Sequence, residues 1–228
     1  MKTVAPVRTN LDQRLTILRG SLAEYFGLVT KEYKHAIDAI TAPSDVPLKK
    51  VHKIRSKVQN RAEDLTQELL LVLTLNQPLL QDLRMIAAYL RAVDAVERLA
   101  RHARDVAVTL NDWAKLDKND APPHEITGRL VVMGKTVTDL VDLVEFALLN
   151  EAVVDQETAV HAWSAVKSHH SEIHTMILEA EKSEVGGRSG RTMLAHITNR
   201  FERSAYNLLR LAELWHHAIE NEWVQYEQ

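Results

Sequence analysis

Helical periodicity constrains this chain more strongly than any other feature of its sequence. Apolar residues recur every three or four positions along six long stretches, and no region shows sustained alternation of the strand type. Only seven glycines and six prolines interrupt the 228 residues. Long helices joined by short loops pack as antiparallel neighbours. The sequence therefore predicts an all-α protein built from six long helices.

The strongest break divides these helices into two groups of three. It is the polar, double-proline segment KLDKNDAPPH at residues 115–124, which we interpret as a linker. Residues 1–9 are expected to form a flexible tail, because Asn10 is a plausible N-cap for the first helix. We therefore predict two tandem antiparallel three-helix bundles, at residues 10–114 and 125–228.

Two details of the helical pattern bear on later argument. The apolar stripe of the first helix has one irregular step, from Val29 to Ala36, where Tyr33 lies just off the line. A glycine-rich segment at residues 186–190, GGRSG, separates the last two helices. It could hold a phosphate at a helix N-terminus, but it lacks the preceding strand and Lys-Ser/Thr ending of a Walker loop. A flexible interhelix loop is the expectation there.

The third helix is expected to begin near Pro78 and to run to about Trp113, and its stretch at residues 76–107 contains a conflict between pattern and charge. Its apolar stripe runs through Leu83, Ile86, Leu90 and Val93, and at the same spacing it meets Glu97. Asp94 and Arg101 lie within one position of that stripe. A charged residue at a core position is costly unless it is paired or liganded. The pattern therefore indicates either an ion-pair network or a site.

The same conflict recurs 105 residues later, since 202 − 97 = 105. Glu202-Arg203 matches Glu97-Arg98, and Asn199 occupies the position that corresponds to Asp94. Each match lies in the third helix of its half. We interpret the chain as an internal duplication of one three-helix unit.

Composition excludes several classes of function. The absence of cysteine excludes disulfides, thiol catalysis and cysteine-ligated metals. A formal net charge of −3 gives no general attraction to nucleic acid or to an anionic membrane. No apolar run approaches the ~18 residues of a membrane span, and the N-terminal residues do not resemble a signal peptide. Because no nucleophile–base arrangement is visible either, we expect a cytoplasmic protein that is not an enzyme.

Part of the third helix resembles a known family. Gln77-Pro78, then Asp82-Leu83-Arg84, Glu97-Arg98 and Ala107 beyond resemble the pattern of the PhoU family, and Phe201-Glu202-Arg203 is an echo in the second half. The resemblance implies a cytoplasmic regulator of phosphate uptake and phosphate-starvation signalling. It implies a non-enzymatic adaptor whose partners are the ATPase of a phosphate ABC transporter and a phosphate-sensing histidine kinase. Broad helical faces also favour a homodimer.

The chain departs from that family at its metal signature. The family has E-x-x-x-D in each repeat, but here Arg101 and Tyr206 stand where the aspartates would be. Because arginine cannot ligate a metal at any accessible pH, we predict no cofactor, or at most a weakly bound divalent metal. The residues that we expect in a polar seam or partner-binding surface are Asp94, Glu97, Arg98, Arg101, Glu202 and Arg203.

Two alternative functions remain open at this point. Eleven histidines are present, and His170 and His174 lie four apart on one helix, a spacing that suits zinc, nickel or copper. With Asp94, Glu97 and Glu202 they could serve a metal-sensing or metal-storage protein, although solvent-exposed or interface histidines would give the same pattern. The other alternative is a helical scaffold of the same fold without a phosphate role.

Arginines and tryptophans complete the set of candidate residues. Five arginines of the third helix lie at spacings of three and seven, and could form an anion-binding or partner-binding strip or a solvated face: Arg84, Arg91, Arg98, Arg101 and Arg104. The four tryptophans are candidates for core residues or partner anchors: Trp113, Trp163, Trp215 and Trp223.

Overall fold

The computed structural model describes residues 7–116, 122–181 and 185–226, and this part of the chain contains helices but no strand. The elements are α1 (Val7–Thr41), the short 3-10 helix η1 (Pro43–Asp45), α2 (Leu48–Asn76), α3 (Leu80–Trp113), α4 (His124–Asn150), α5 (Gln156–Glu179) and α6 (Gly187–Glu220). The all-α prediction is confirmed. None of these helices carries an apolar stretch long enough to cross a bilayer.

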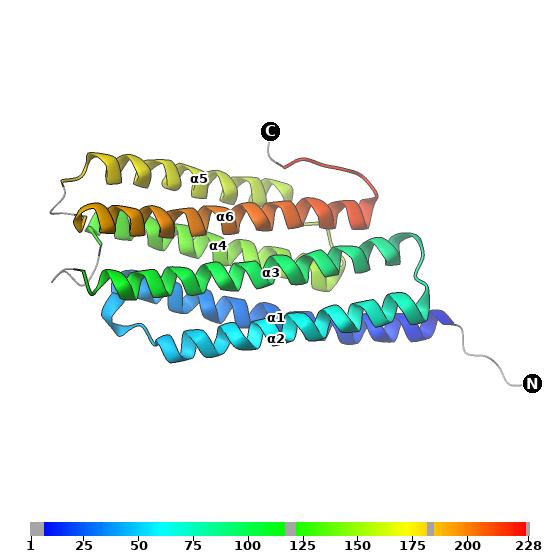
Figure 1. The fold of residues 1–228 in the computed structure, drawn as a ribbon. Coiled ribbons are helices and arrows are strands. Elements are labelled where there is room, and N and C mark those ends of the chain that lie inside the picture. The colour runs from blue at the N-terminus through cyan, green and yellow to red at the C-terminus, as the bar shows by residue number, and fades with distance from the viewer. Residues whose placement is uncertain (1–6, 117–121, 182–184, 227–228) are drawn as a thin grey trace, which may run out of the picture.

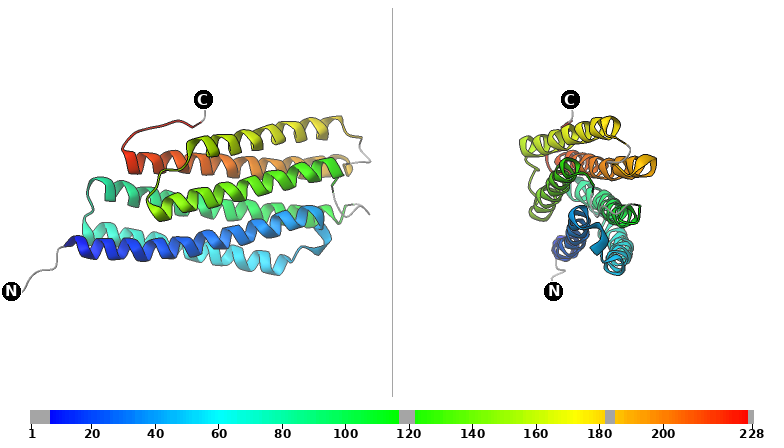
Figure 2. Two further views of the ribbon diagram at one scale, coloured as in Figure 1. Left: turned by 180° about the vertical axis from the view of Figure 1, so that it is seen from behind. Right: turned by 90° about the vertical axis from the view of Figure 1, so that its left-hand side faces the viewer.

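The helices form two groups of three, which lie side by side along their length (Figure 1). In the first group α1, α2 and α3 pack against one another, and in the second group α4, α5 and α6 do so. The end view places α5 at one edge and α1 with α2 at the opposite edge (Figure 2). The groups meet through α3 against α6 and α1 against α4, so that their apolar residues form one continuous core.

Helix α3 belongs to the first group and lies at its boundary with the second group. It is therefore buried around most of its circumference. Small side chains on two of its faces let neighbouring helices approach closely, and these are Ala88, Ala92, Ala95, Ala100, Ala103 and Ala107. Helix α6 likewise buries two alanines, Ala205 and Ala212. Close approach maximises dispersion contacts, which accounts for the extensive packing between α3 and α6. Any polar residue on the shared face is consequently removed from water.

Several helix ends differ from the sequence-based expectation. Helix α1 begins at Val7, inside the tail that we expected at residues 1–9, while residues 1–6 lie outside the described part. Of the predicted linker at 115–124, residues 117–121 likewise lie outside it. Asp155 caps α5, since its carboxylate accepts a hydrogen bond from the Thr158 backbone N–H at 3.0 Å.

The glycine-rich segment is a packed helix start, which corrects our expectation of a flexible loop. Gly186 and Gly187 adopt φ of 64° and 66°, and α6 begins at Gly187. The N–H of Gly190 donates to the Gly186 carbonyl at 3.1 Å. A Cβ on Gly190 would lie 1.9 Å from the Val185 carbonyl oxygen and 2.8 Å from the Trp113 ring. The segment therefore packs the start of α6 against Trp113 at the end of α3.

The turn between α2 and α3 also departs from the expected pattern. We expected Pro78 near the first helical position, but α3 begins two residues later, at Leu80. Gln77 and Leu80 both have positive φ, 45° and 51°, a conformation that costs non-glycine residues about 1–3 kcal/mol. The side chain of Leu83, which the stripe placed in the core, is 46% exposed. The buried face of α3 is therefore offset from the predicted stripe in its first turns.

Candidate functional site

Glu97 is the centre of a mostly buried ion-pair cluster. Its side chain is only 16% exposed, and it lies between α3 and α2. One carboxylate oxygen accepts a hydrogen bond from Arg55 of α2, and the other accepts from Nη2 of Arg101 at 2.7 Å. The Arg55 side chain is itself 13% exposed. Because both carboxylate oxygens are held by guanidinium groups, the conflict seen in the sequence is resolved by charge pairing.

Asp94 lies one turn earlier on α3 and faces solvent. Its carboxylate pairs with Nη2 of Arg98 at 2.6 Å, and its side chain is 59% exposed. Water and salt weaken such a pair, which contributes little to stability. Asp94 and Glu97 line one groove of about 510 Å³ between α2 and α3. The groove does bring the two predicted carboxylates together, but each carboxylate has an arginine as its counterion.

The most unusual polar residue of this region, Glu32, was missed by the sequence analysis. It lies on α1, is completely buried, and has two carboxylate oxygens without a hydrogen-bond partner in the described structure. Burial raises the pKa of Glu32 to about 8, against the opposing effects of Arg55 and Arg104. A carboxyl group in this environment is mostly protonated at neutral pH. One nitrogen of Arg55, Nη1, is also buried and unpaired among the described residues.

A second polar network joins the two helical groups. The Ser204 hydroxyl of α6 lies 2.9 Å from Nδ1 of His102 on α3 and accepts a 2.6 Å hydrogen bond from the Tyr33 hydroxyl of α1. Burial is the main cause that lowers the pKa of His102 to about 4, and the Arg200 guanidinium lowers it further. His102 is consequently neutral at physiological pH. The network fixes the register of α3, α6 and α1 without adding a buried charge.

Asp105 provides a charged link between the groups close to this network. Its carboxylate pairs with Arg104 of its own helix and with Nη2 of Arg200 on α6, the latter at 3.0 Å. Asp105 was not among the residues that we selected from sequence. The only feature of the sequence that could have indicated Asp105 is its position next to Arg104. The contact between α3 and α6 therefore contains a polar seam, and it is made by His102 and Asp105, which the sequence analysis did not select.

The second copy of the duplicated motif does not reproduce the first. Glu202 and Arg203 make no hydrogen bond or ion pair within the described residues, and Tyr206 instead packs on Trp163 with ring centroids 5.7 Å apart. Because α3 and α6 run antiparallel, Glu97 and Glu202 lie on opposite sides of the contact between His102 and Ser204. The two glutamates do not form a shared site.

The histidine pair lies between α5 and α6. His170 Nε2 lies 2.8 Å from the Asn199 side-chain oxygen, and the rings of His170 and His174 are 4.4 Å apart. Burial and the neighbouring His170 lower the pKa of His174. Nowhere in the described residues do three or more histidine or acidic side chains converge as metal ligands would. The donor sets at Glu97, Glu202 and His170 therefore do not fit the metal that the family signature implies.

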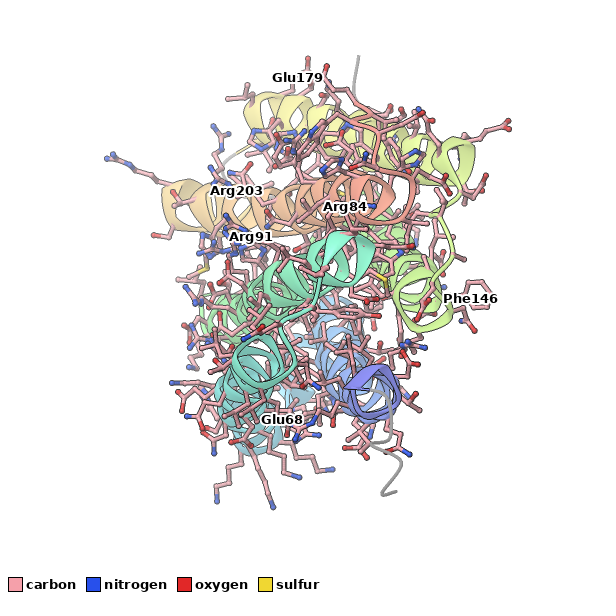
Figure 3. The ribbon with its side chains drawn as sticks, turned by 90° about the vertical axis from the view of Figure 1, so that its right-hand side faces the viewer. Glu68, Arg84, Arg91, Phe146, Glu179 and Arg203 are labelled. Carbon is pink, nitrogen blue, oxygen red and sulfur yellow. The ribbon has the colours of Figure 1, made fainter. Side chains whose placement is uncertain are left out.

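Exposed arginines run along the boundary between α3 and α6. Figure 3 shows Arg84, Arg91 and Arg203 on this boundary. Arg84 is fixed by a hydrogen bond from its Nε to the Ala218 carbonyl at 3.2 Å. Arg91 and Arg203 reach solvent, and among the residues that the structure describes neither has an ion-pair partner. Of the five arginines grouped from sequence, Arg98, Arg101 and Arg104 are paired with acidic side chains of α3, whereas Arg84 and Arg91 lie on this boundary together with Arg203 of α6.

Comparisons with known proteins agree with this architecture. Residues 22–110 match the family model for the PhoU domain. The crystal structure of PhoU from Pseudomonas aeruginosa superposes with a TM-score of 0.81 at 18% sequence identity, covering 92% of this chain and 99% of that chain. The phosphate transport system regulatory protein PhoU from Streptococcus pneumoniae gives 0.79 at 16% identity, covering 94% and 99%. No curated protein sequence matches significantly. The chain is thus similar in sequence to the PhoU domain over residues 22–110, and it has the fold of the two PhoU crystal structures over nearly its whole length.

Proposed function

We propose that this protein is a cytoplasmic, non-enzymatic regulator of phosphate uptake and of the phosphate-starvation response. The observation that carries the proposal is the match to the fold of PhoU over 92% of this chain and 99% of the Pseudomonas aeruginosa protein. The Streptococcus pneumoniae protein of the same fold is a phosphate transport system regulatory protein. A match of both helical groups is needed for this argument, because the family model alone covers residues 22–110.

The mechanism that we propose is that of an adaptor. The protein holds the ATPase of a phosphate ABC transporter and a phosphate-sensing histidine kinase in a low-activity state when phosphate is plentiful. Such a role requires a rigid body with exposed charged groups rather than a reactive centre. The seam at His102 and Asp105 supports the first requirement, and the solvent-facing Arg98 and Arg203 support the second.

The adaptor that we propose works without a metal. In this chain Glu97 is neutralised by Arg55 and Arg101, so the charge that a cation would supply is already provided by side chains. The two helical groups are also held together by Asp105 and Arg200. Changes in metal supply are therefore not expected to alter how the groups dock.

Affinity purification of the full chain from cells grown in high and in low phosphate tests the adaptor role. Transporter ATPase and sensor kinase should be recovered, with more of both in high phosphate. Arg203→Glu should reduce that recovery because the side chain reaches solvent on the α3–α6 boundary. Arg188→Glu is a matched control, since it makes the same charge change at the start of α6. Recovery of neither component under either condition would contradict the adaptor mechanism.

We also propose that the protein is a homodimer, as broad helical faces favour self-association. Sedimentation equilibrium of the purified chain measures the mass directly. A species of twice the 25.9 kDa chain mass supports this assembly, and a monomer over the accessible concentration range contradicts it.

A further inference from the structure

A pocket of about 580 Å³ lies between α3, α6 and the segment that follows α6. Arg91 of α3 and Arg210 of α6 line it from two helices, and Trp223 and Val224 form the wall contributed by the C-terminal segment. Leu214 provides an apolar part of the lining. Its volume falls within the ~300–1,000 Å³ of small-molecule sites and is far larger than a single inorganic anion requires.

The C-terminal wall is held in place by a buried carboxylate. Glu213 is buried, and one of its oxygens accepts a 2.8 Å hydrogen bond from the backbone N–H of Tyr226. Its other oxygen pairs with Arg210. The Tyr226 hydroxyl donates to the Val154 carbonyl at 3.2 Å. These contacts fix the segment that carries Trp223 and thereby define this wall of the pocket.

The charge of the pocket favours an anion. Glu213 is the one acidic side chain among the described residues of its lining, and Arg210 and the Tyr226 N–H satisfy both carboxylate oxygens. Arg210 uses one of its five N–H groups for that pair and is 56% exposed. Arg91 is exposed and makes no ion pair with any described residue. Two guanidinium groups therefore remain able to bind a phosphate, which they match geometrically.

The wall of the pocket also offers an aromatic surface. Trp223 stacks on His217 with ring centroids 3.8 Å apart and an interplanar angle of 13°. The indole is nevertheless 74% exposed, whereas the other three tryptophans are at most 5% exposed. One face of the ring is therefore held flat by His217, while much of the remaining surface is open to a planar partner. Nucleobases stack on exposed aromatic rings of this kind.

We propose that this pocket binds a nucleoside phosphate, with the phosphate on Arg91 and Arg210 and the base on Trp223. The proposal deepens the regulatory function proposed above and rests on it, because it assigns the regulator a small-molecule effector site. The shared chemistry of the ligand is a phosphate group, which inorganic phosphate also offers. The aromatic wall distinguishes a nucleoside phosphate from inorganic phosphate, since only a ligand with a base can stack on Trp223.

Isothermal titration of the purified full chain, at fixed ionic strength and without divalent cations, tests this proposal directly. The probes are AMP, ATP, adenosine, ribose 5-phosphate and inorganic phosphate. AMP or ATP should bind at one site per chain and more tightly than any of the fragments. Arg91→Glu should weaken nucleotide binding by about tenfold or more because it replaces a phosphate-binding group with a repelling one. Arg188→Glu is the matched control, with the same charge change at an exposed arginine of α6 that lies outside the lining.

Trp223→Ala separates the role of the base from that of the phosphate. This variant should weaken AMP binding and leave the affinity for inorganic phosphate unchanged. Because the indole is exposed, thermal melting should show that the variant folds as the wild type does.

Three results would overturn the proposal. One is the absence of nucleotide binding at about 1 mM, a concentration at which even very weak affinity would be detected. Another is an equal loss of nucleotide affinity in Arg91→Glu and Arg188→Glu. The third is inorganic phosphate bound as tightly as AMP. Because the measurement uses purified protein alone, its failure leaves the outcome of the partner purification unaffected.

Discussion

Replacement of the buried Glu32 by glutamine should change the stability of the protein in a pH-dependent way. Relative to the wild type, the free energy of unfolding of the variant should increase as pH rises. Glu32 is completely buried and has no hydrogen-bond partner for either oxygen in the described structure. Its pKa is about 8 in the folded protein, against 4.5 for an ordinary glutamate. Glutamine has nearly the same size but carries no titratable proton, so the variant isolates the cost of that buried acid.

The sign and size of the effect follow from proton linkage. Below pH 4.5 both the folded and the unfolded chain hold the proton of Glu32, and its ionisation does not affect stability. Between pH 4.5 and about 8 the unfolded chain releases this proton while the folded chain retains it. The free energy of unfolding therefore falls as pH rises, by at most about 1.4 kcal/mol per pH unit. Over the whole interval the loss approaches about 5 kcal/mol, and above it the loss becomes constant.

Urea unfolding of the wild type and of Glu32→Gln at several pH values between 5 and 8 measures this difference. The variant should gain stability relative to the wild type steadily with pH. Glu24→Gln is the control, because it makes the same substitution on the same helix at a side chain that is 80% exposed. A flat difference for Glu32→Gln, or a wild type that gains on the variant with pH, would refute the reasoning. It would mean that Glu32 is ionised and paired with Arg55.

Three further outcomes are expected. Glu97→Ala should cost about 3–5 kcal/mol in urea unfolding because it leaves the buried Arg55 without its counterion, and a cost below about 1 kcal/mol would show the pair to be solvated. Gly190→Ala should lower the melting temperature because its Cβ meets backbone, whereas Gly128→Ala, with open space around it in α4, should raise the melting temperature slightly. Elemental analysis of the purified protein should show no stoichiometric transition metal, and one metal per chain would contradict that prediction.

Much of the fold could be predicted from sequence because helical periodicity is local. Helices α1 and α2 end at Thr41 and Asn76, each two residues before a proline, which lacks the backbone N–H that a helix interior needs. The predicted helix bounds were wrong where tertiary packing determines the local backbone conformation. Gly190 is an example: its neighbours in sequence indicate a loop, but the approach of Trp113 and Val185 makes the segment the first turn of α6.

The candidate site was predicted only in part, for a related reason. The unusual burial of Glu97 was visible as a charge on an apolar stripe, and its pairing with Arg101 follows from helical spacing. The pairing with Arg55 was not visible, because that contact depends on how α2 docks on α3. Glu32 left a weaker signal, the irregular step in the stripe of α1. Because the neighbouring Tyr33 could fill a core position at that step, the pattern did not indicate that Glu32 is buried as well.

The arginine strip shows a further limit of sequence reasoning. The spacing of arginines on α3 indicated one face of a helix but not the residues that would oppose it. In the structure α6 adds Arg203 and Arg210 to that face, and the segment after α6 adds Trp223. A partly enclosed pocket thus arises from three segments, of which α3 is distant in sequence from the other two. Its existence depends on the docking of the second helical group, which no local pattern specifies.

The central claim, that this chain regulates phosphate uptake, is tested most directly by deleting its gene and measuring phosphate import together with a phosphate-starvation reporter in phosphate-rich medium. Loss of the protein should leave import and the reporter high despite abundant phosphate, and expression of the wild-type chain should restore repression. Import and reporter activity that remain repressed in the deletion strain, as in the parent, would contradict the account.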